Sequence, residues 1–313
     1  MKHPILNFVG TGCLTATLML LVACGGGSQT QQKKEKTYLP PTVPSMISEP
    51  DQRAAYAVEH YWDKFDFTDR EWIADSGALE QTFANYIGIM GYAPENSVRT
   101  SFAKTFATAA KDSAMYRRLA QVAEHYLYEP NSPMKNEAWY VAVLDALLSD
   151  SVLTDAEKVR LQFQRQMTQR NQVGEKAADI PFVTSNGVEG SLYGLKSPYV
   201  LLFFHDPDCG TCRDLTLMID RSGVIQQLIA SKQLTVLTIY PDEEEQAWRN
   251  HLTQMPQLGW IHGWDQQRVL RREHRYDLRA LPTLYLLDKG KKVLIKDGTF
   301  NIIEQACSKL EVD

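Results

Sequence analysis

Two cysteines separated by two residues, Cys209 and Cys212, constrain what this chain can fold into more than any other feature. They follow the continuous apolar run 199–204, which has the length and character of a strand buried inside a sheet. A helical stretch starts at the pair and extends to about residue 228. This order predicts that the first thiol lies over the unpaired N–H groups of a helix N-terminus, where a thiolate is favoured. The second thiol, one helical turn away, can resolve a mixed disulfide formed on the first.

The pattern on both sides of the pair predicts a mixed α/β sheet over residues 177–313. Strand-like runs lie at 180–183, 199–204, 234–240, 283–287 and 293–295. The first is expected to form a hairpin about the turn Asn186-Gly187, and the last two are expected to form another. Asn301 is expected to cap the closing helix. The order strand, helix, strand, helix, hairpin, helix predicts a mixed sheet with helices on both faces.

Residues 48–172 have a different texture. Apolar residues recur there at spacings of three and four, and we find neither strand alternation nor an internal repeat. Thr154 and Glu157 have the spacing of a capping box at the start of the last helix. We therefore predict an all-α domain of about six helices. An aromatic cluster that includes Trp62 and Phe65 is interpreted as core, with a ligand platform as the alternative.

Residues 1–23 predict a cleaved signal peptide. Their apolar stretch is too short and too early for a permanent membrane span, and small residues precede the expected cut. The end of the stretch, Leu-Val-Ala-Cys at 21–24, resembles a bacterial lipobox, which implies that Cys24 is diacylated and becomes the new N-terminus. The alternative is an ordinary signal with a chance cysteine. Residues 24–47, rich in Gly, Ser, Gln and Pro, are expected to form a solvated tether.

Composition narrows the functional classes. The 313 residues are 44% hydrophobic and 23% charged, which is globular composition and enough chain for two domains. The net charge of −5, with no concentrated basic face, argues against a nucleic-acid partner. Of five cysteines, Cys13 leaves with the signal and Cys24 carries lipid, so the remaining three make no disulfide framework. Cys307 is interpreted as a small packed side chain.

A second landmark, Leu281-Pro282-Thr283, lies just before a predicted strand. A proline there fits poorly into a sheet ladder unless its peptide bond is cis. Together with the strand, the cysteine pair and the helix, it resembles the thioredoxin superfamily, and within it the membrane-tethered thiol–disulfide oxidoreductases of the TlpA/ResA kind. The resemblance covers about residues 177–313. It implies that Cys209 attacks, Cys212 resolves, Pro282 packs against the pair and Leu281 offers its backbone to the substrate.

The helical half also resembles a known domain. Tyr61-Trp-Asp-Lys-Phe-Asp-Phe67 and the proline-containing segment 126–133 are similar to a helical domain of unknown function that precedes thioredoxin-like domains in bacterial lipoproteins. The resemblance covers most of residues 46–172. It implies an architecture and a location, without an activity.

Some positions depart from the thioredoxin pattern. Phe203 stands where many thioredoxins carry a buried acid, and Asp208 stands in place of a tryptophan before the first cysteine. The acceptor of the resolving thiol's proton is therefore left open among four carboxylates: Asp206, Asp208, Asp214 and Glu189. Acids close to Cys209, without a histidine between the cysteines, favour a reductant or weak isomerase over a strong oxidant.

Two other functions remain open from the residues. His205, Cys209 and Cys212 could bind copper or zinc, with His274 as a further ligand. His251 and His262 are interpreted as surface or cap residues. Alternatively, the chain is a non-catalytic binding lipoprotein that keeps only a thioredoxin-like scaffold.

The preferred interpretation is an enzyme that acts through the dithiol. We expect neither a cofactor nor a metal for it. Its expected partners are disulfide-containing protein substrates, an electron-donor protein and a bacterial membrane reached through the lipid on Cys24. The expected location is extracytoplasmic, on the periplasmic side or the cell surface.

Overall fold

The computed structural model describes residues 36–310, all of which belong to one compact unit. The predicted signal peptide, Cys24 and the first part of the predicted tether lie outside the described residues. Within residues 36–310, no helix combines the length and the apolar character needed to cross a bilayer.

The first half of the described chain is helical. Its helices are α1 (Pro50–Glu59), α2 (Glu71–Ala74), α3 (Ser76–Met90), α4 (Glu95–Ala109), α5 (Ser113–Leu127), α6 (Glu137–Ser149) and α7 (Asp155–Thr168). The four-residue α2 is the element that the periodicity did not predict, because one helical turn shows no repeat. The capping box is confirmed: the Thr154 side chain accepts from the Glu157 N–H, and the Glu157 carboxylate accepts from the Thr154 N–H.

The aromatic cluster near α1 and α2 is core, as predicted. Five of its rings have relative exposures of 3–7%: Tyr61, Trp62, Phe65, Phe67 and Trp72. Trp62 stacks edge-on against Phe65, with 4.9 Å between ring centroids. These residues belong to one apolar cluster that extends across the helical region and contains no residue of the sheet. The helical region therefore has a hydrophobic core of its own.

The second half of the described chain is built on a seven-stranded mixed sheet in the order β2-β1-β5-β4-β3-β6-β7. Its strands are β1 (Pro181–Thr184), β2 (Glu189–Ser191), β3 (Tyr199–Phe204), β4 (Leu234–Tyr240), β5 (Trp260–Trp264), β6 (Thr283–Leu287) and β7 (Val293–Lys296). β3 lies between parallel β4 and antiparallel β6. The two predicted central strands and both predicted hairpins are present, because continuous apolar runs and turn residues are strong local signals.

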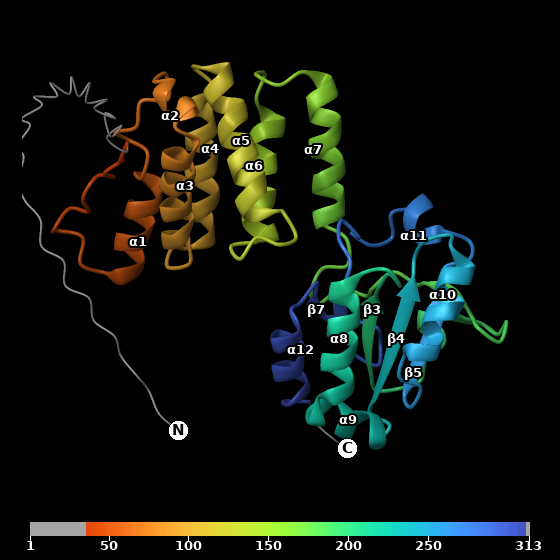
Figure 1. Ribbon diagram of the computed structural model, residues 1–313. Coiled ribbons are helices and arrows are strands. Elements are labelled where there is room, and N and C mark those ends of the chain that lie inside the picture. The colour runs from red at the N-terminus through yellow and green to blue at the C-terminus, as the bar shows by residue number, and fades with distance from the viewer. Residues whose placement is uncertain (1–35, 311–313) are drawn as a thin grey trace, which may run out of the picture. The chain divides into compact units, whose positions relative to one another are not determined.

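Helices cover the two faces of the sheet unequally. α8 (Gly210–Arg221), α9 (Gly223–Ala230), α10 (Glu245–His251) and α12 (Phe300–Cys307) contribute buried side chains to the cluster on one face (Figure 1). The other face is covered by the short α11 (Val269–Arg272) together with the segment that carries Ile180 and Leu192. Short 3₁₀ turns lie at Leu192–Gly194 and Leu252–Gln254. The expected helices on both faces are present, although one face has a single short helix.

One strand was missed, and two local predictions need correction. β5 was not predicted, because Trp260-Ile-His-Gly-Trp264 is neither continuously apolar nor cleanly alternating. A Cβ on Gly263 would lie 2.8 Å from both Ile239 and Phe182, so glycine lets the neighbouring side chains close over this strand.

The predicted helical stretch after Cys209 is two helices, because Ser222 ends α8 and caps α9 by accepting from the Ile225 N–H. Thr299, not Asn301, occupies the N-cap of α12.

Candidate active site

The antiparallel pairing of β3 with β6 brings the two sequence landmarks to one edge of the sheet. Phe204, the last residue of β3, pairs with Thr283, the first residue of β6. The chain that leaves β3 toward Cys209 and the chain that enters β6 through Pro282 therefore meet at the same end. The Leu281–Pro282 peptide bond is cis. The structure thus brings together the four residues to which the thioredoxin resemblance assigns roles in disulfide exchange: Cys209, Cys212, Leu281 and Pro282.

Cys209 occupies the N-cap position of α8 and is half-buried. Its sulfur accepts a hydrogen bond from the Cys212 backbone N–H at 3.2 Å, and its thiol donates to the Leu281 carbonyl oxygen at 3.6 Å. A sulfur in this position faces the unpaired N–H groups and positive end of the helix dipole, which favour negative charge. Cys209 is therefore the sulfur that is both reachable and placed as an attacking group.

Cys212 lies beneath Cys209 and is 1% exposed. Burial raises the pKa of its thiol, the hydrogen bond to Cys209 raises it further, and the Asp206 backbone N–H opposes the shift. Cys212 therefore keeps its proton at neutral pH, and its deprotonation must accompany any attack that it makes. Both thiols are free, so the site is a dithiol in this structure.

Of the four candidate proton acceptors, Asp206 is the one whose charge acts on the Cys212 thiol. Its charge is among the causes that raise the pKa of the Cys212 thiol, and its Oδ1 accepts from the Asp208 N–H at 2.7 Å. Asp208 and Asp214 are exposed, and Glu189 lies on the edge strand β2. Phe203 is fully buried in the same apolar cluster as Cys212. At the position where many thioredoxins carry a buried acid, this chain therefore has an apolar core side chain.

A set of buried histidines beside α8 is the feature that the sequence did not indicate. His205 is 1% exposed, and neither of its ring nitrogens has a partner. Burial, together with the neighbouring His251 and His262, lowers its pKa to about 3. The His205 and His251 ring centroids lie 5.8 Å apart. The sequence did not indicate that these histidines are buried, because His251 and His262 look like polar surface positions when their tertiary neighbours are unknown.

The histidines do not assemble the metal site that was the main alternative. His274 packs edge-on to Phe163 of α7, with 4.9 Å between ring centroids. His262 is held between Thr238 Oγ1 and the Pro256 carbonyl. Among residues 36–310, no group of three His, Cys, Asp or Glu side chains is arranged to hold a metal ion. Cys307 is a packed side chain in the cluster that contains Cys212.

Arg279, three residues before Pro282, ties the site to the helical region. Its guanidinium lies 3.5 Å from the centroid of the Tyr128 ring and donates to the Tyr128 carbonyl. It also pairs with Glu137 Oε1 at 2.8 Å and with Asp277 Oδ2 at 2.9 Å. All three charged side chains are 20% exposed or less, so loss of one partner would leave a largely desolvated charge. We call this group the Arg279 clamp.

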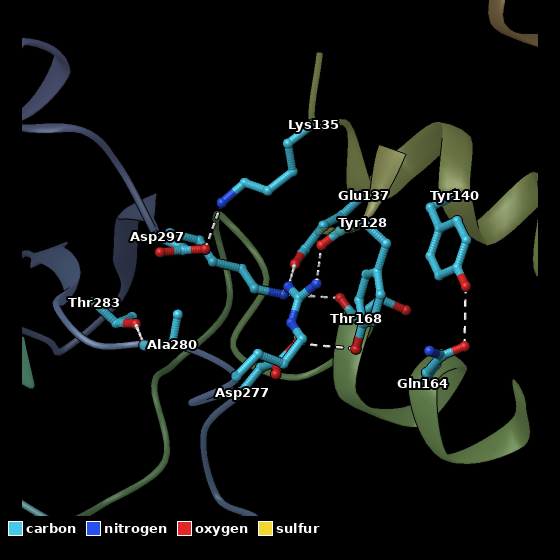
Figure 2. Close-up of polar contacts among 12 residues, drawn as sticks. Tyr128, Lys135, Glu137, Tyr140, Gln164, Thr168, Asp277, Ala280, Thr283 and Asp297 are labelled. Atoms are coloured by element: carbon cyan, nitrogen blue, oxygen red, sulfur yellow. Dashed lines mark hydrogen bonds and ion pairs between the residues drawn. The ribbon is translucent and has the colours of Figure 1, made fainter. Parts of the chain in front are cut away.

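Further contacts extend the same junction. Figure 2 shows Lys135, from the helical region, directed toward Asp297 of the second half of the chain. Lys135 Nζ lies 2.5 Å from Asp297 Oδ2. Lys296 Nζ lies 2.7 Å from Glu137 Oε2 and donates to the Thr168 carbonyl at 2.8 Å. The loop between α5 and α6 is therefore fixed beside the segment that carries Pro282.

The contrast between the two thiols predicts a selective alkylation pattern. With iodoacetamide at pH 8, Cys209 should be modified more than about tenfold faster than Cys212, since each unit of raised pKa removes about a factor of ten in thiolate. The rate at Cys212 should still be rising at pH 10. Peptide mass spectrometry of the quenched protein reports both sites. Equal rates at pH 8 would contradict the buried, protonated state of Cys212.

Comparison with known proteins agrees with this geometry. Residues 197–293 match a family described as thioredoxin-like, and residues 24–171 match a domain of unknown function (DUF5106). Bovine nucleoredoxin is 24% identical over 124 residues, which are 39% of this chain and 28% of nucleoredoxin. The chain thus spans less than a third of the length of the nucleoredoxins that it matches.

Solved structures extend the likeness to both halves of the chain. The C-terminal domain of an uncharacterized protein from Bacteroides fragilis is 41% identical and covers 44% of this chain and 99% of that one, with a TM-score of 0.44. A thioredoxin-like protein from Bacteroides caccae is 38% identical and covers 87% of this chain and 98% of that one, with a TM-score of 0.81. The chain therefore belongs to the thioredoxin-like proteins.

Proposed function

We propose that this protein is a membrane-anchored, extracytoplasmic thiol–disulfide oxidoreductase that reduces or isomerises disulfides in other proteins through Cys209 and Cys212. The observation that carries the proposal is the position of the Cys209 sulfur. It lies at the N-terminus of α8, 3.6 Å from the carbonyl oxygen of Leu281, with Cys212 buried below it. The attacking sulfur of Cys209, the resolving sulfur of Cys212 and the backbone of Leu281 thus lie together at the N-terminus of α8.

The first half-reaction is a nucleophilic exchange. The Cys209 thiolate attacks one sulfur of the substrate disulfide, the substrate S–S bond breaks, and the other substrate sulfur leaves as a thiolate that takes up a proton. The backbone of Leu281 lies beside the reacting sulfur and can pair with the extended substrate chain that carries it. The product of this step is a mixed disulfide between Cys209 and the substrate.

The second half-reaction uses Cys212. Its thiol gives up a proton and its sulfur attacks the Cys209 sulfur. The Cys209–Cys212 disulfide forms, the bond between Cys209 and the substrate breaks, and the second substrate sulfur leaves as a thiolate that takes up a proton. Asp206 is the proposed proton acceptor, since it lies beside Cys212 and remains half-buried. The net result is two electrons and two protons transferred from the dithiol to the substrate. A partner dithiol protein must then reduce the new disulfide for the cycle to repeat.

Loss of Cys209 should abolish turnover. The wild-type chain should accelerate the reduction of insulin disulfides by dithiothreitol, whereas Cys209→Ser should fall to the uncatalysed rate because no attacking sulfur remains. Turbidity of the released insulin B chain measures both rates. Cys307→Ala is the control, because Cys307 is a free cysteine outside the pair, on α12, and it should keep the wild-type rate. A Cys209→Ser variant as active as wild type would overturn the proposed function.

The membrane anchor is a separate part of the proposal. It is supported by the likeness of residues 21–24 to a lipobox and by the polar stretch that follows. In a bacterial host, radiolabelled palmitate should be incorporated into the wild-type chain and not into Cys24→Ala, which should also leave the membrane fraction. Label retained in Cys24→Ala, or absent from the wild-type chain, would contradict lipidation at this residue.

A further inference from the structure

α8 exposes two different stripes beside the cysteine pair. One stripe, with Thr211, Leu215 and Met218, lines a hollow of about 270 Å³ together with Phe300 of α12. The other stripe, with Leu217, lines a smaller hollow beside His251. Met218 and Leu217 are adjacent in sequence and almost equally exposed, at 45% and 47%. The two sides of α8 therefore differ in what they face, although their exposed apolar side chains are alike.

The hollow beside Met218 adjoins a second hollow of the same volume, with which it shares four lining residues. Both hollows are lined by Thr211, Pro282 and Asp297, and both are lined by Pro130 of the helical region. Thr211 lies between the two cysteines in the sequence, so the lining that the two hollows share lies next to the dithiol. We call the two adjoining hollows together the Pro282 cleft. Its outer wall is formed by Pro130, Asn131 and Lys135, which lie in the segment that connects α5 and α6.

The outer wall is held in place by charges. The Arg279 clamp fixes Tyr128 and Glu137, at the two ends of the connecting segment, and the Lys135–Asp297 pair fixes its middle (Figure 2). Because these pairs are largely shielded from water, they position the segment more firmly than exposed surface pairs would. The wall is therefore a built part of the site, and the helical region supplies it.

We infer that the helical region selects the substrate: the Pro282 cleft takes an extended, cysteine-bearing segment of a polypeptide that carries an apolar side chain next to the cysteine. This inference rests on the proposed function and names its substrate class. The apolar side chain lies against Leu215, Met218 and Phe300, and the methionine adapts to its shape. The backbone passes between Pro282 and Pro130. A cleft of this volume, closed by an outer wall, accommodates side chains of an extended strand and not a folded domain.

The test compares the two stripes of α8. The prereduced full chain is mixed with a disulfide-linked dimer of a short peptide that has leucine beside its cysteine, with a matched aspartate peptide, or with hydroxyethyl disulfide. Alkylation and mass spectrometry follow oxidation of the dithiol. We expect the leucine peptide to react about tenfold faster than the aspartate peptide, equivalent to about 1.4 kcal/mol. Met218→Glu should lower the ratio of the leucine-peptide rate to the hydroxyethyl disulfide rate about tenfold.

Leu217→Glu is the matched control and should keep the wild-type preference. A larger loss in Leu217→Glu than in Met218→Glu, or a wild-type chain without preference, would overturn the inference. Failure of the proposed function has a different signature: the wild-type chain and Cys209→Ser would then react equally slowly with hydroxyethyl disulfide.

A second pair of variants tests the outer wall itself. Asn131 is exposed and lines the cleft, whereas Glu129 is exposed two residues earlier and lines neither hollow. Asn131→Trp should slow the leucine peptide relative to hydroxyethyl disulfide, because the indole obstructs the chain path. Glu129→Trp should not. Equal behaviour of the two tryptophan variants would show that the helical region does not border the bound substrate.

Discussion

The approach of the Cys209 thiol to the Leu281 carbonyl oxygen, at 3.6 Å, is the contact on which the proposed function of this protein depends. It exists because β3 and β6 are antiparallel neighbours, which bring the end of one and the start of the other to the same edge of the sheet. The apolar cluster beneath α8 then holds Cys212 out of water under Cys209. The fold thus creates an asymmetric dithiol, in which one sulfur is reachable and the other is kept protonated.

The same edge of the sheet is also where the helical region is attached. Arg279 lies only three residues before Pro282, and it contacts Tyr128 and Glu137 at the ends of the loop between α5 and α6. A helical domain with its own core could have been joined to the sheet anywhere. Its attachment beside the dithiol supports the proposal that the helical region influences which disulfides reach Cys209. The thioredoxin-like protein from Bacteroides caccae, similar over 87% of this chain, shares both halves.

Much of the fold followed from local sequence, and the junction did not. The run Tyr199–Phe204 and the cysteine pair after it are local signals, so the strand, the helix N-terminus and the dithiol could be predicted. β5 was not predicted, because Gly263 breaks the alternation of apolar and polar residues along it. The Arg279 clamp was not predicted for another reason. Tyr128 and Glu137 lie more than 140 positions from Arg279 in the sequence, and no periodicity links them. The buried state of His205 likewise depends on neighbours from other elements.

The most direct test of this account is the crystal structure of a trapped mixed disulfide. Cys212→Ser cannot resolve a mixed disulfide, so the full chain with this substitution should hold a leucine-containing cysteine peptide on Cys209. The account predicts that the peptide backbone runs past Leu281, between Pro282 and Pro130, with its leucine against Met218. A peptide bound along the Leu217 side of α8, with the Pro282 cleft empty, would contradict the role assigned to the helical region.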